Sequence, residues 1–336
     1  MTLKDPEEMV FPSLISACAF HDIYLSNDPS QAVMVRGLRS LSSASNERRP
    51  GVAELPASLL EDVTKLLGRV EARFLESKEG EFVVMYDDIY YRCALIASPG
   101  ALDVQSPMAT RDWCLRQIGS HAPEIDEIHL PGDLVVALRQ AGKERGLVII
   151  SGSFGSGKST TASAAFLDWV RGNRESGVTF EDPPEFPLSG RYPDGGIIHQ
   201  IPVTQTTLSG SIISARRWAP RYIFLGEIRP PGSAAELLHM AISGPMTLCT
   251  VHASDLVQAL ASLARFAGAA IGDEEARRMI AASVRLVVHQ DLSWGHMIAR
   301  KAVFHPHSMQ SMRHKIETGR FNALYEDFDR QSTGLN

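Results

Sequence analysis

Gly152 and the triplet Gly157-Lys158-Ser159 carry the clearest chemical signal in the sequence. They stand in SGSFGSGKST, which fits G-x-x-x-x-G-K-[ST] between an apolar run and a helical pattern. Such glycines let backbone N–H groups turn toward phosphate oxygens, at a helix N-terminus whose dipole favours anions. The pattern predicts a nucleoside triphosphate site, and the alternative is a flexible loop beside a surface lysine. The predicted phosphate-binding residues are Gly152, Gly155, Ser156, Gly157, Lys158, Ser159 and Thr160.

Polar groups at the ends of three apolar runs supply further candidates. Mg²⁺ prefers oxygen ligands, and an attacking water needs a base or a positioning group. Glu227 ends YIFLGE, Glu181 and Asp182 end VTFED with Glu185 shortly after, and His252 ends TLCTVH. Groups of this kind belong at the carboxyl ends of parallel strands. The alternatives are solvated strand ends and a structural histidine. The predicted Mg²⁺ ligands are Ser159 and Glu181.

The elements that must position these groups predict an α/β fold. The continuous apolar run GLVIISG is typical of a parallel strand buried on both faces. GVTFED and RYIFLGE predict two more strands, and VRLVVHQDLSWGHMIARKAVF predicts two strands joined around Trp294-Gly295. We expect a first domain at residues 1–118, a linker at 119–130, and a second domain at 131–336 with C-terminal helices and the hairpin.

The first domain is predicted to mix strands with one helix. DIYLSN and AVMVRGL predict short strands, and EFVVMYDDIYYRCALIA predicts two β-rich runs around the turn Asp87-Asp88. Between these strands, apolar residues recur at helical spacing after Pro56. The apolar positions of this amphipathic helix are Leu59, Val63, Leu66, Val70 and Phe74.

Composition favours a globular cytosolic protein. Hydrophobic residues at 44% and charged residues at 21% exclude a disordered chain, and 336 residues are enough for two domains. A formal net charge of -6 argues against a basic field for nucleic acid. The start MTLKDPEEMV does not have the pattern of a signal peptide, and no run has the composition of a membrane span. The 4 scattered cysteines indicate a reducing compartment.

Four motifs together resemble a known family. SGSFGSGKSTT, TFEDPPEF, RRWAPRYIFLGEIR and TVHA occur in the order and spacing of the secretion and type IV pilus ATPases, the traffic ATPases. The chain is most similar to the branch that holds the pilus-retraction motor PilT and the Dot/Icm-type and conjugative ATPases DotB and TraJ. The resemblance covers residues 10–305. It implies a RecA-like P-loop NTPase domain with a smaller PAS-like α+β N-terminal domain.

The resemblance also implies a function and a place of work. It implies a homo-hexameric ATPase that uses ATP and Mg²⁺ to power a type IV pilus, type IV secretion or conjugative transfer machine. The expected location is cytoplasmic, peripheral to the inner membrane through an inner-membrane component of the machine. No direct contact with nucleic acid is expected.

Roles carry over at the matching positions. Lys158 and Ser159 match the Walker A residues, and Glu181 and Glu185 match the carboxylates of the Asp box. The resemblance makes Arg217 the arginine of the LRxxP motif and Arg229 the arginine that follows GE. The implied catalytic residues are Glu227 at Walker B, Glu181, the second His-box residue His252, and Arg217.

Two arginines of the first domain are implied as nucleotide contacts. YYRCAL and CLRQIG look like family strands, which offer Arg92 and Arg116 as basic groups that close on a nucleotide. The alternative for each arginine is a surface ion pair, which contributes little to stability.

The sequence departs from the family pattern at two positions. Gly232 stands where the family has an acidic residue, and Pro245 replaces the first His-box histidine. Both lie between the Walker B strand and the His box, so we expect activity with altered coupling or a slower cycle. An ATP-binding, weakly hydrolysing assembly or regulatory subunit is the second hypothesis. A small-molecule kinase is a third reading, but the sequence offers no substrate lid for it.

Overall fold

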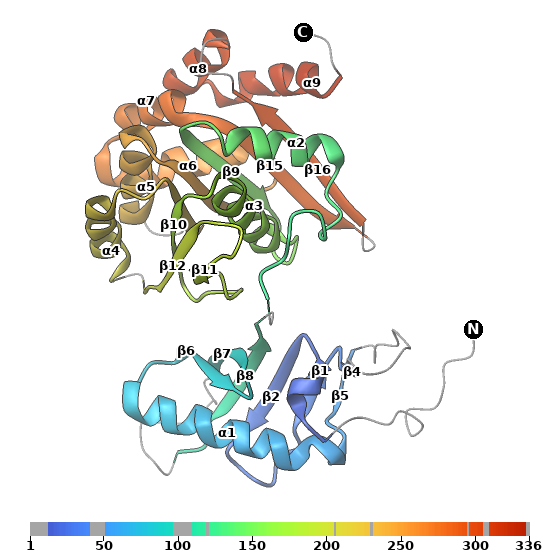
Figure 1. The fold of residues 1–336 in the computed structure, drawn as a ribbon. Helices are drawn as coiled ribbons and strands as arrows, with labels where there is room; N and C mark the ends of the chain where they lie inside the picture. Colours follow the sequence, from blue (N-terminus) through green and yellow to red (C-terminus); the bar gives the residue numbers. More distant parts are fainter. Residues whose placement is uncertain are drawn as a thin grey trace. The chain divides into compact units, whose positions relative to one another are not determined.

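The computed structural model describes residues 13–40, 51–96, 109–118, 121–204, 206–228, 231–293, 296–304 and 309–333. The chain forms two compact units, residues 1–120 and 121–336, which run from blue to red along the sequence in Figure 1. The boundary falls inside the segment that the sequence analysis assigns to a linker. Each unit has its own sheet and its own core, so each is described by itself.

The first unit is built on a six-stranded antiparallel sheet in the order β5-β3-β2-β8-β7-β6. The helix α1 (Ala57–Ser77) buries its apolar face in the same core, and the five apolar positions predicted for it are all buried. The predicted strands and the turn at Asp87-Asp88 are confirmed. The strands are β2 (Asp22–Ser26), β3 (Met34–Arg36), β5 (Val52–Glu54), β6 (Glu81–Tyr86), β7 (Ile89–Ile96) and β8 (Asp112–Gln117). The short helix η2 (Ile15–Ala17) precedes β1 (Cys18–Ala19), which pairs separately with β4 (Arg39–Ser40).

The second unit is built on an eight-stranded sheet in the order β11-β12-β10-β13-β14-β9-β15-β16. The six strands from β12 to β15 are parallel, and β11 and β16 pair antiparallel at the edges. The strands are β9 (Gly146–Gly152), β10 (Ser176–Glu181), β11 (Gly190–Arg191), β12 (Ile197–Pro202), β13 (Tyr222–Glu227), β14 (Met246–His252), β15 (Val284–Ser293) and β16 (His296–Val303). The predicted C-terminal hairpin is therefore confirmed, while Trp294 and Gly295 lie outside the described residues.

Helices cover both faces of this sheet, as Figure 1 shows. On one face lie α2 (Gly132–Ala141) and α3 (Lys158–Asn173). The other face packs against α4 (Leu208–Ala215), α5 (Pro231–Ser243), α6 (Leu256–Ile271), α7 (Asp273–Ser283), α8 (Gln310–Glu317) and α9 (Tyr325–Thr333), with the short helices η3 (Arg216–Trp218) and η4 (Phe321–Leu324) between them. Because helices cover both faces, the central strands are apolar on both sides and do not alternate between apolar and polar residues.

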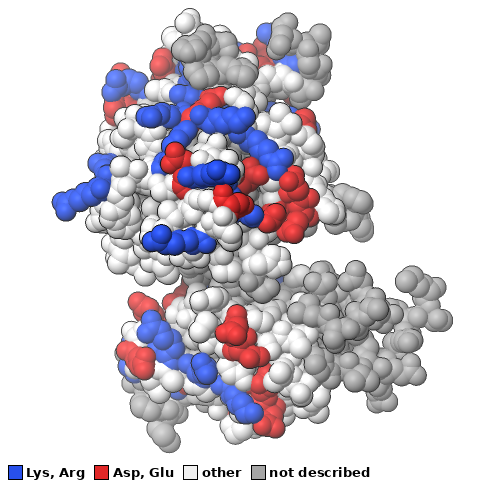
Figure 2. Space-filling view, viewed as in Figure 1, with Lys and Arg blue, Asp and Glu red and all other residues white. Residues whose placement is uncertain are grey.

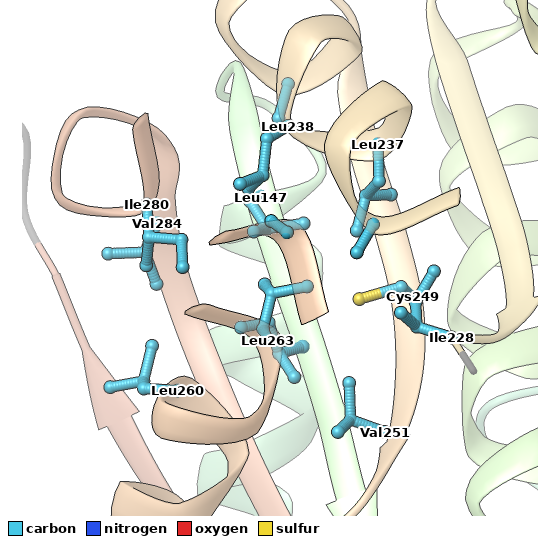
Figure 3. Packing of buried hydrophobic residues seen from close by; sticks show 14 of the residues in the cluster. Leu147, Ile228, Leu237, Leu238, Cys249, Val251, Leu260, Leu263, Ile280 and Val284 are labelled. Carbon is cyan, nitrogen blue, oxygen red and sulfur yellow. The ribbon is translucent and has the colours of Figure 1, made fainter. Parts of the chain in front are cut away.

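The strand β9 is buried along its whole length, as its apolar run predicts. Alternate residues enter the two cores: Leu147 and Ile149 face α5 to α7, and Val148 and Ile150 face α3. Figure 3 shows Leu147 packed with Leu237 and Leu238 of α5 and with other buried side chains of this core. Removing this apolar surface from water is the main stabilising contribution to the layer.

The surface of the second unit carries both signs of charge. In the view of Figure 2, basic and acidic side chains are interspersed over that unit. Among the described residues, no helix is long and apolar enough to cross a membrane.

Candidate nucleotide-binding site

The residues predicted to bind phosphate form the connection between β9 and α3. Gly152 ends the strand and Lys158 begins the helix. Gly152, Gly155 and Gly157 have φ values of 157°, 74° and 82°, which side-chain-bearing residues adopt only with strain. Gly157 is the N-cap of α3 and has no side chain with which to cap the helix. The N–H groups of the first turn are thus suited to an external acceptor such as a phosphate oxygen.

The loop lies tightly against β15. A Cβ on Gly152 would stand 2.1 Å from the Gln290 carbonyl oxygen and 2.5 Å from Ser156 Oγ. A Cβ on Gly157 would stand 3.3 Å from Gln290 Nε2. A Cβ on Gly155, by contrast, would meet nothing within 4 Å. The glycines therefore serve close packing on one side of the loop and leave the other side open to a ligand.

Lys158 is half-buried at the start of α3. Its Nζ donates a hydrogen bond of 2.7 Å to the Ser153 carbonyl oxygen within the loop. Burial lowers the pKa of its ammonium group, while the carboxylates of Glu227 and Glu185 oppose this effect. Glu227 and Glu185 therefore lie within electrostatic reach of Lys158, as a shared phosphate site requires.

Glu227 and Glu181 end adjacent strands but differ in environment. Glu227 is exposed, and a bulge at Gly226 separates it from the regular part of β13. The bulge is tied to β14 by a hydrogen bond of 2.6 Å from Thr250 Oγ1 to the Gly226 carbonyl oxygen. Bulges re-aim side chains at the rims of sheets. Glu227 thus reaches solvent beside the loop, whereas residues 222–225 of its strand are buried.

Glu181 is held inside the sheet at 5% exposure. Its Oε1 accepts hydrogen bonds from Thr179 Oγ1 at 2.7 Å and from Gln200 Nε2 at 2.8 Å. Burial is the main cause that raises the pKa of this carboxyl above its ordinary value. Among the described residues, no group of three or more His, Cys, Asp and Glu could hold a metal ion.

His252 contacts the loop directly from β14. Its Nδ1 lies 2.9 Å from the Gly152 carbonyl oxygen, next to it in the register of the two strands. Because a carbonyl oxygen only accepts, Nδ1 is the nitrogen that carries hydrogen in this contact. The residue is exposed, so its other ring nitrogen, Nε2, is accessible to a ligand.

The remaining predicted residues lie at several places. Ser159 and Thr160 follow Lys158 in the first turn of α3 and are half-buried. Arg217 is exposed on η3, and Arg229 lies outside the described residues. Arg116 belongs to the first unit.

Within that unit, the two arginines implied as nucleotide contacts make ion pairs. Arg116 Nε and a terminal nitrogen donate to Asp22 Oδ1 at 2.9 Å and 2.8 Å, and Arg36 pairs with the other oxygen. Arg92 lies 3.5 Å from Glu81. The side chain of Arg116 is nevertheless 46% exposed, so part of it is accessible to a ligand.

The fold is similar to that of known proteins. The model of a family described as "Type II/IV secretion system protein" matches residues 118–326. The chain belongs to this family. Among its curated relatives, the uncharacterized protein YggR of Escherichia coli (strain K12) is 31% identical over 193 residues, which are 56% of this chain and 57% of YggR. The type IV pilus ATPase PilU of Pseudomonas aeruginosa is 31% identical over 156 residues, which are 45% of this chain and 39% of PilU.

The likeness of fold extends over both units. This secretion-family chain spans about half the length of the curated relatives it matches. The structure of the pilus retraction motor PilT with bound ADP matches with a TM-score of 0.66 at 19% identity, over 91% of this chain and 84% of PilT. The family chain therefore has the α/β fold predicted for it, a RecA-like domain with a smaller N-terminal domain.

Sequence reasoning missed the contacts that β15 makes with the loop of this family member. Gln290 Nε2 donates to the Ser156 carbonyl oxygen at 2.7 Å, and Ser153 Oγ donates to Asp291 Oδ1 at 3.2 Å. His289 Nδ1 lies 3.3 Å from Ser151 Oγ, and burial lowers the pKa of its ring. The signal that could have found them is a polar triplet directly after VRLVV, at the carboxyl end of a buried strand.

A cavity of about 250 Å³ lies at the same end of the hairpin, beside α9. Its lining combines acidic, basic and aromatic side chains: Ser254, Asp255, Leu256, His289, Asp291, Ile298, Arg300, Lys301, Tyr325, Phe328 and Asp329. Its three aspartates outnumber its two basic side chains, Arg300 and Lys301, so it attracts a phosphate less than a site of N–H donors does. The loop with uncapped N–H groups is the better anion site.

Proposed function

We propose that this chain binds ATP with Mg²⁺ at the loop between β9 and α3 and hydrolyses it. The observation that carries the proposal is the open, glycine-lined helix N-terminus, with Lys158 in the electrostatic field of Glu227 and Glu185. A cation that binds the β- and γ-phosphates and carboxylates that act on Mg²⁺ or water are the parts that phosphoryl transfer needs. The bound ADP of the PilT structure supports the same ligand class.

Each residue has a role in this proposal. The Lys158 ammonium exchanges its hydrogen bond to the Ser153 carbonyl oxygen for one to a phosphate oxygen, so a charged acceptor replaces a neutral one. Ser159 in the first turn of α3 and Glu181 are the proposed protein contacts to Mg²⁺, whose remaining ligands are phosphate oxygens and water. Glu227 is the exposed carboxylate that orients or activates water. His252 presents its free nitrogen beside the loop and responds to the γ-phosphate.

The proposed assembly is a homo-hexamer that powers a pilus, secretion or conjugation machine from the cytoplasmic side of the inner membrane. The family description and the names of the relatives support the class of machine. An inner-membrane component of that machine is the proposed partner, and no direct contact with nucleic acid is proposed. Arg217 and Arg116 are the proposed basic groups that complete the nucleotide site.

A second function is favoured by one specific observation. Gly232 in the first turn of α5 and Pro245 before β14 depart from the family motifs on the connection that follows Glu227. An ATP-binding subunit with weak hydrolysis would fit these departures. Steady-state phosphate release by the purified protein separates a motor from such a subunit.

The Lys158→Ala variant tests the site itself. Because it removes the ammonium from the β- and γ-phosphates, we expect turnover to vanish and ATP affinity to fall. Hydrolysis by Lys158→Ala at the parent rate would show that the site is wrong. A parent protein that binds ATP but releases almost no phosphate would instead support the second function.

A further inference from the structure

Gln290 is a fully buried amide beneath the loop. It lies at the carboxyl end of β15 with 0% exposure, in parallel register with Gly152 of β9. Its side chain spans to the Ser156 carbonyl oxygen, which accepts from Nε2 at 2.7 Å. Since a carbonyl oxygen only accepts, the orientation of the amide is determined by this contact.

The hydrogen bond has a consequence for the next N–H group. In a planar trans peptide, the C=O of one residue and the N–H of the next point in opposite directions. Holding the Ser156 carbonyl toward β15 therefore turns the Gly157 N–H away from β15. Gly157 is the N-cap of α3, so this N–H faces the position where an anion binds at the helix N-terminus.

We propose that Gln290 is a positioning residue that orients the Gly157 N–H toward the phosphates of the bound nucleotide. The inference rests on the proposed function, because it needs the loop to bind a nucleotide. Gln290 itself lies behind the loop and acts on the ligand through the Ser156–Gly157 peptide.

Within the described part of the chain, the amide of Gln290 uses only its donor. Gln290 Oε1 and the neighbouring Ser156 Oγ are buried and have no hydrogen-bond partner among the described residues. A half-satisfied buried amide costs free energy. An apolar side chain of similar shape would remove that cost but also the donor to the Ser156 carbonyl oxygen, so the two effects on stability oppose each other. An amide retained at this cost fits a residue needed for its single donated bond.

The first experiment compares Gln290→Met with the parent protein by calorimetric titration of Mg-ADP. Methionine keeps the approximate volume and removes the donor, so we expect affinity to fall about tenfold, the scale of one buried hydrogen bond. The melting temperature without nucleotide should stay near that of the parent. Gln331→Met is the matched control, since the Gln331 amide accepts a hydrogen bond from the Val303 N–H and donates one to the Val303 carbonyl oxygen, both of 3.0 Å, in the same unit. Its Mg-ADP affinity should equal that of the parent.

The second experiment uses pH to test the donated bond. In Gln290→Glu the buried carboxyl should have a raised pKa, and only its protonated form can donate to the Ser156 carbonyl oxygen. We expect its Mg-ADP affinity relative to the parent to recover as pH falls from about 8 to about 5.5. The relative affinity of Gln290→Met should not change over that range. This arm decides the question if Gln290→Met proves unfolded.

The outcomes separate this inference from the proposed function. A parent protein that does not bind Mg-ADP or Mg-ATP overturns the proposed function and the role of Gln290 together. A parent that binds, with Gln290→Met binding equally well, overturns the role of Gln290 alone. A pH-independent defect of Gln290→Glu, equal to that of Gln290→Met, also overturns it.

Discussion

Two carboxylates at the ends of neighbouring strands lie in different environments, and different roles are proposed for them. Glu227 is exposed past a bulge and acts electrostatically on Lys158, while Glu181 is buried and hydrogen bonded to Thr179 and Gln200. An exposed carboxylate suits the proposed role of orienting or activating water. Burial raises the pKa of the Glu181 carboxyl, and the proposed contact to Mg²⁺ would favour its ionised form.

Glu227→Gln tests the first of these roles. The amide keeps the shape and removes the charge that orients or activates water. We expect near-normal ATP binding, with phosphate release lower by about two orders of magnitude or more. Titration with a fluorescent ATP analogue and a phosphate-release assay check the two quantities separately. Equal losses of binding and turnover would make Glu227 a structural carboxylate.

Glu181→Gln tests the buried carboxyl through the pH dependence of stability. The folded-state pKa is raised above the unfolded value, so the folded state binds more protons and the parent loses stability as pH rises through this window. Glutamine does not titrate and can still accept from Thr179 and Gln200. The free energy of unfolding of Glu181→Gln should therefore improve relative to the parent as pH rises from about 5 to about 8.

Chemical denaturation at several pH values measures this difference, and Mg²⁺-dependent turnover should fall in the same variant. A difference in unfolding free energy that is the same at every pH would contradict the raised pKa. A substitution that increases stability and reduces activity, as expected for Glu181→Gln, indicates a functional group that is retained at a cost in stability.

At the scale of elements, local patterns predict which strands end in candidate functional side chains, but they do not predict which strands are neighbours in the sheet. GLVIISG, GVTFED and RYIFLGE have signals within a few residues, and they are confirmed as β9, β10 and β13. Gln290 and Ser156 are 134 positions apart, and their contact exists because β15 pairs with β9. Strand order results from the packing of the whole sheet, so the triplet after VRLVV could be noticed but not assigned.

The packing of β15 against the loop leads to a prediction for Gly152. In Gly152→Ala the new methyl group would meet the backbone oxygen of Gln290, which cannot move without breaking the strand pairing. We expect loss of both Mg-ADP affinity and unfolding free energy. Gly172→Ala in the exposed last turn of α3 is the control, since its Cβ meets nothing within 4 Å.

Helix propensity should make Gly172→Ala neutral or more stable by up to about 1 kcal/mol. Chemical denaturation and calorimetry compare the two variants with the parent. A Gly152→Ala protein that matches the parent in both measurements would mean that the loop is not held against β15.

At the scale of the whole molecule, the proposed site also includes two arginines that lie outside the phosphate loop in the sequence. Arg116 lies in the first unit and is paired with Asp22, and Arg217 is exposed on η3. Charge develops on the γ-phosphate during transfer, and an arginine supplied from elsewhere can stabilise it by several kcal/mol. A head-to-tail ring would bring such a residue from one subunit to the loop of the next.

Mixing two inactive chains tests whether Arg217 acts across a subunit boundary. Arg217→Ala alone should lose turnover and keep most nucleotide affinity, and Lys158→Ala should lose turnover through its own loop. In a random equimolar ring, about a quarter of the interfaces join an intact loop to an intact arginine, so mixing should restore up to about a quarter of parent activity. Arg216→Ala is the control, because Arg216 is paired with Glu236 of its own chain at 2.8 Å. It should keep its turnover without any partner.

Parent activity per chain should also rise with protein concentration as rings form. A protein that is monomeric with ATP and Mg²⁺, and whose mixed variants stay inactive, would rule out both the ring and the shared site.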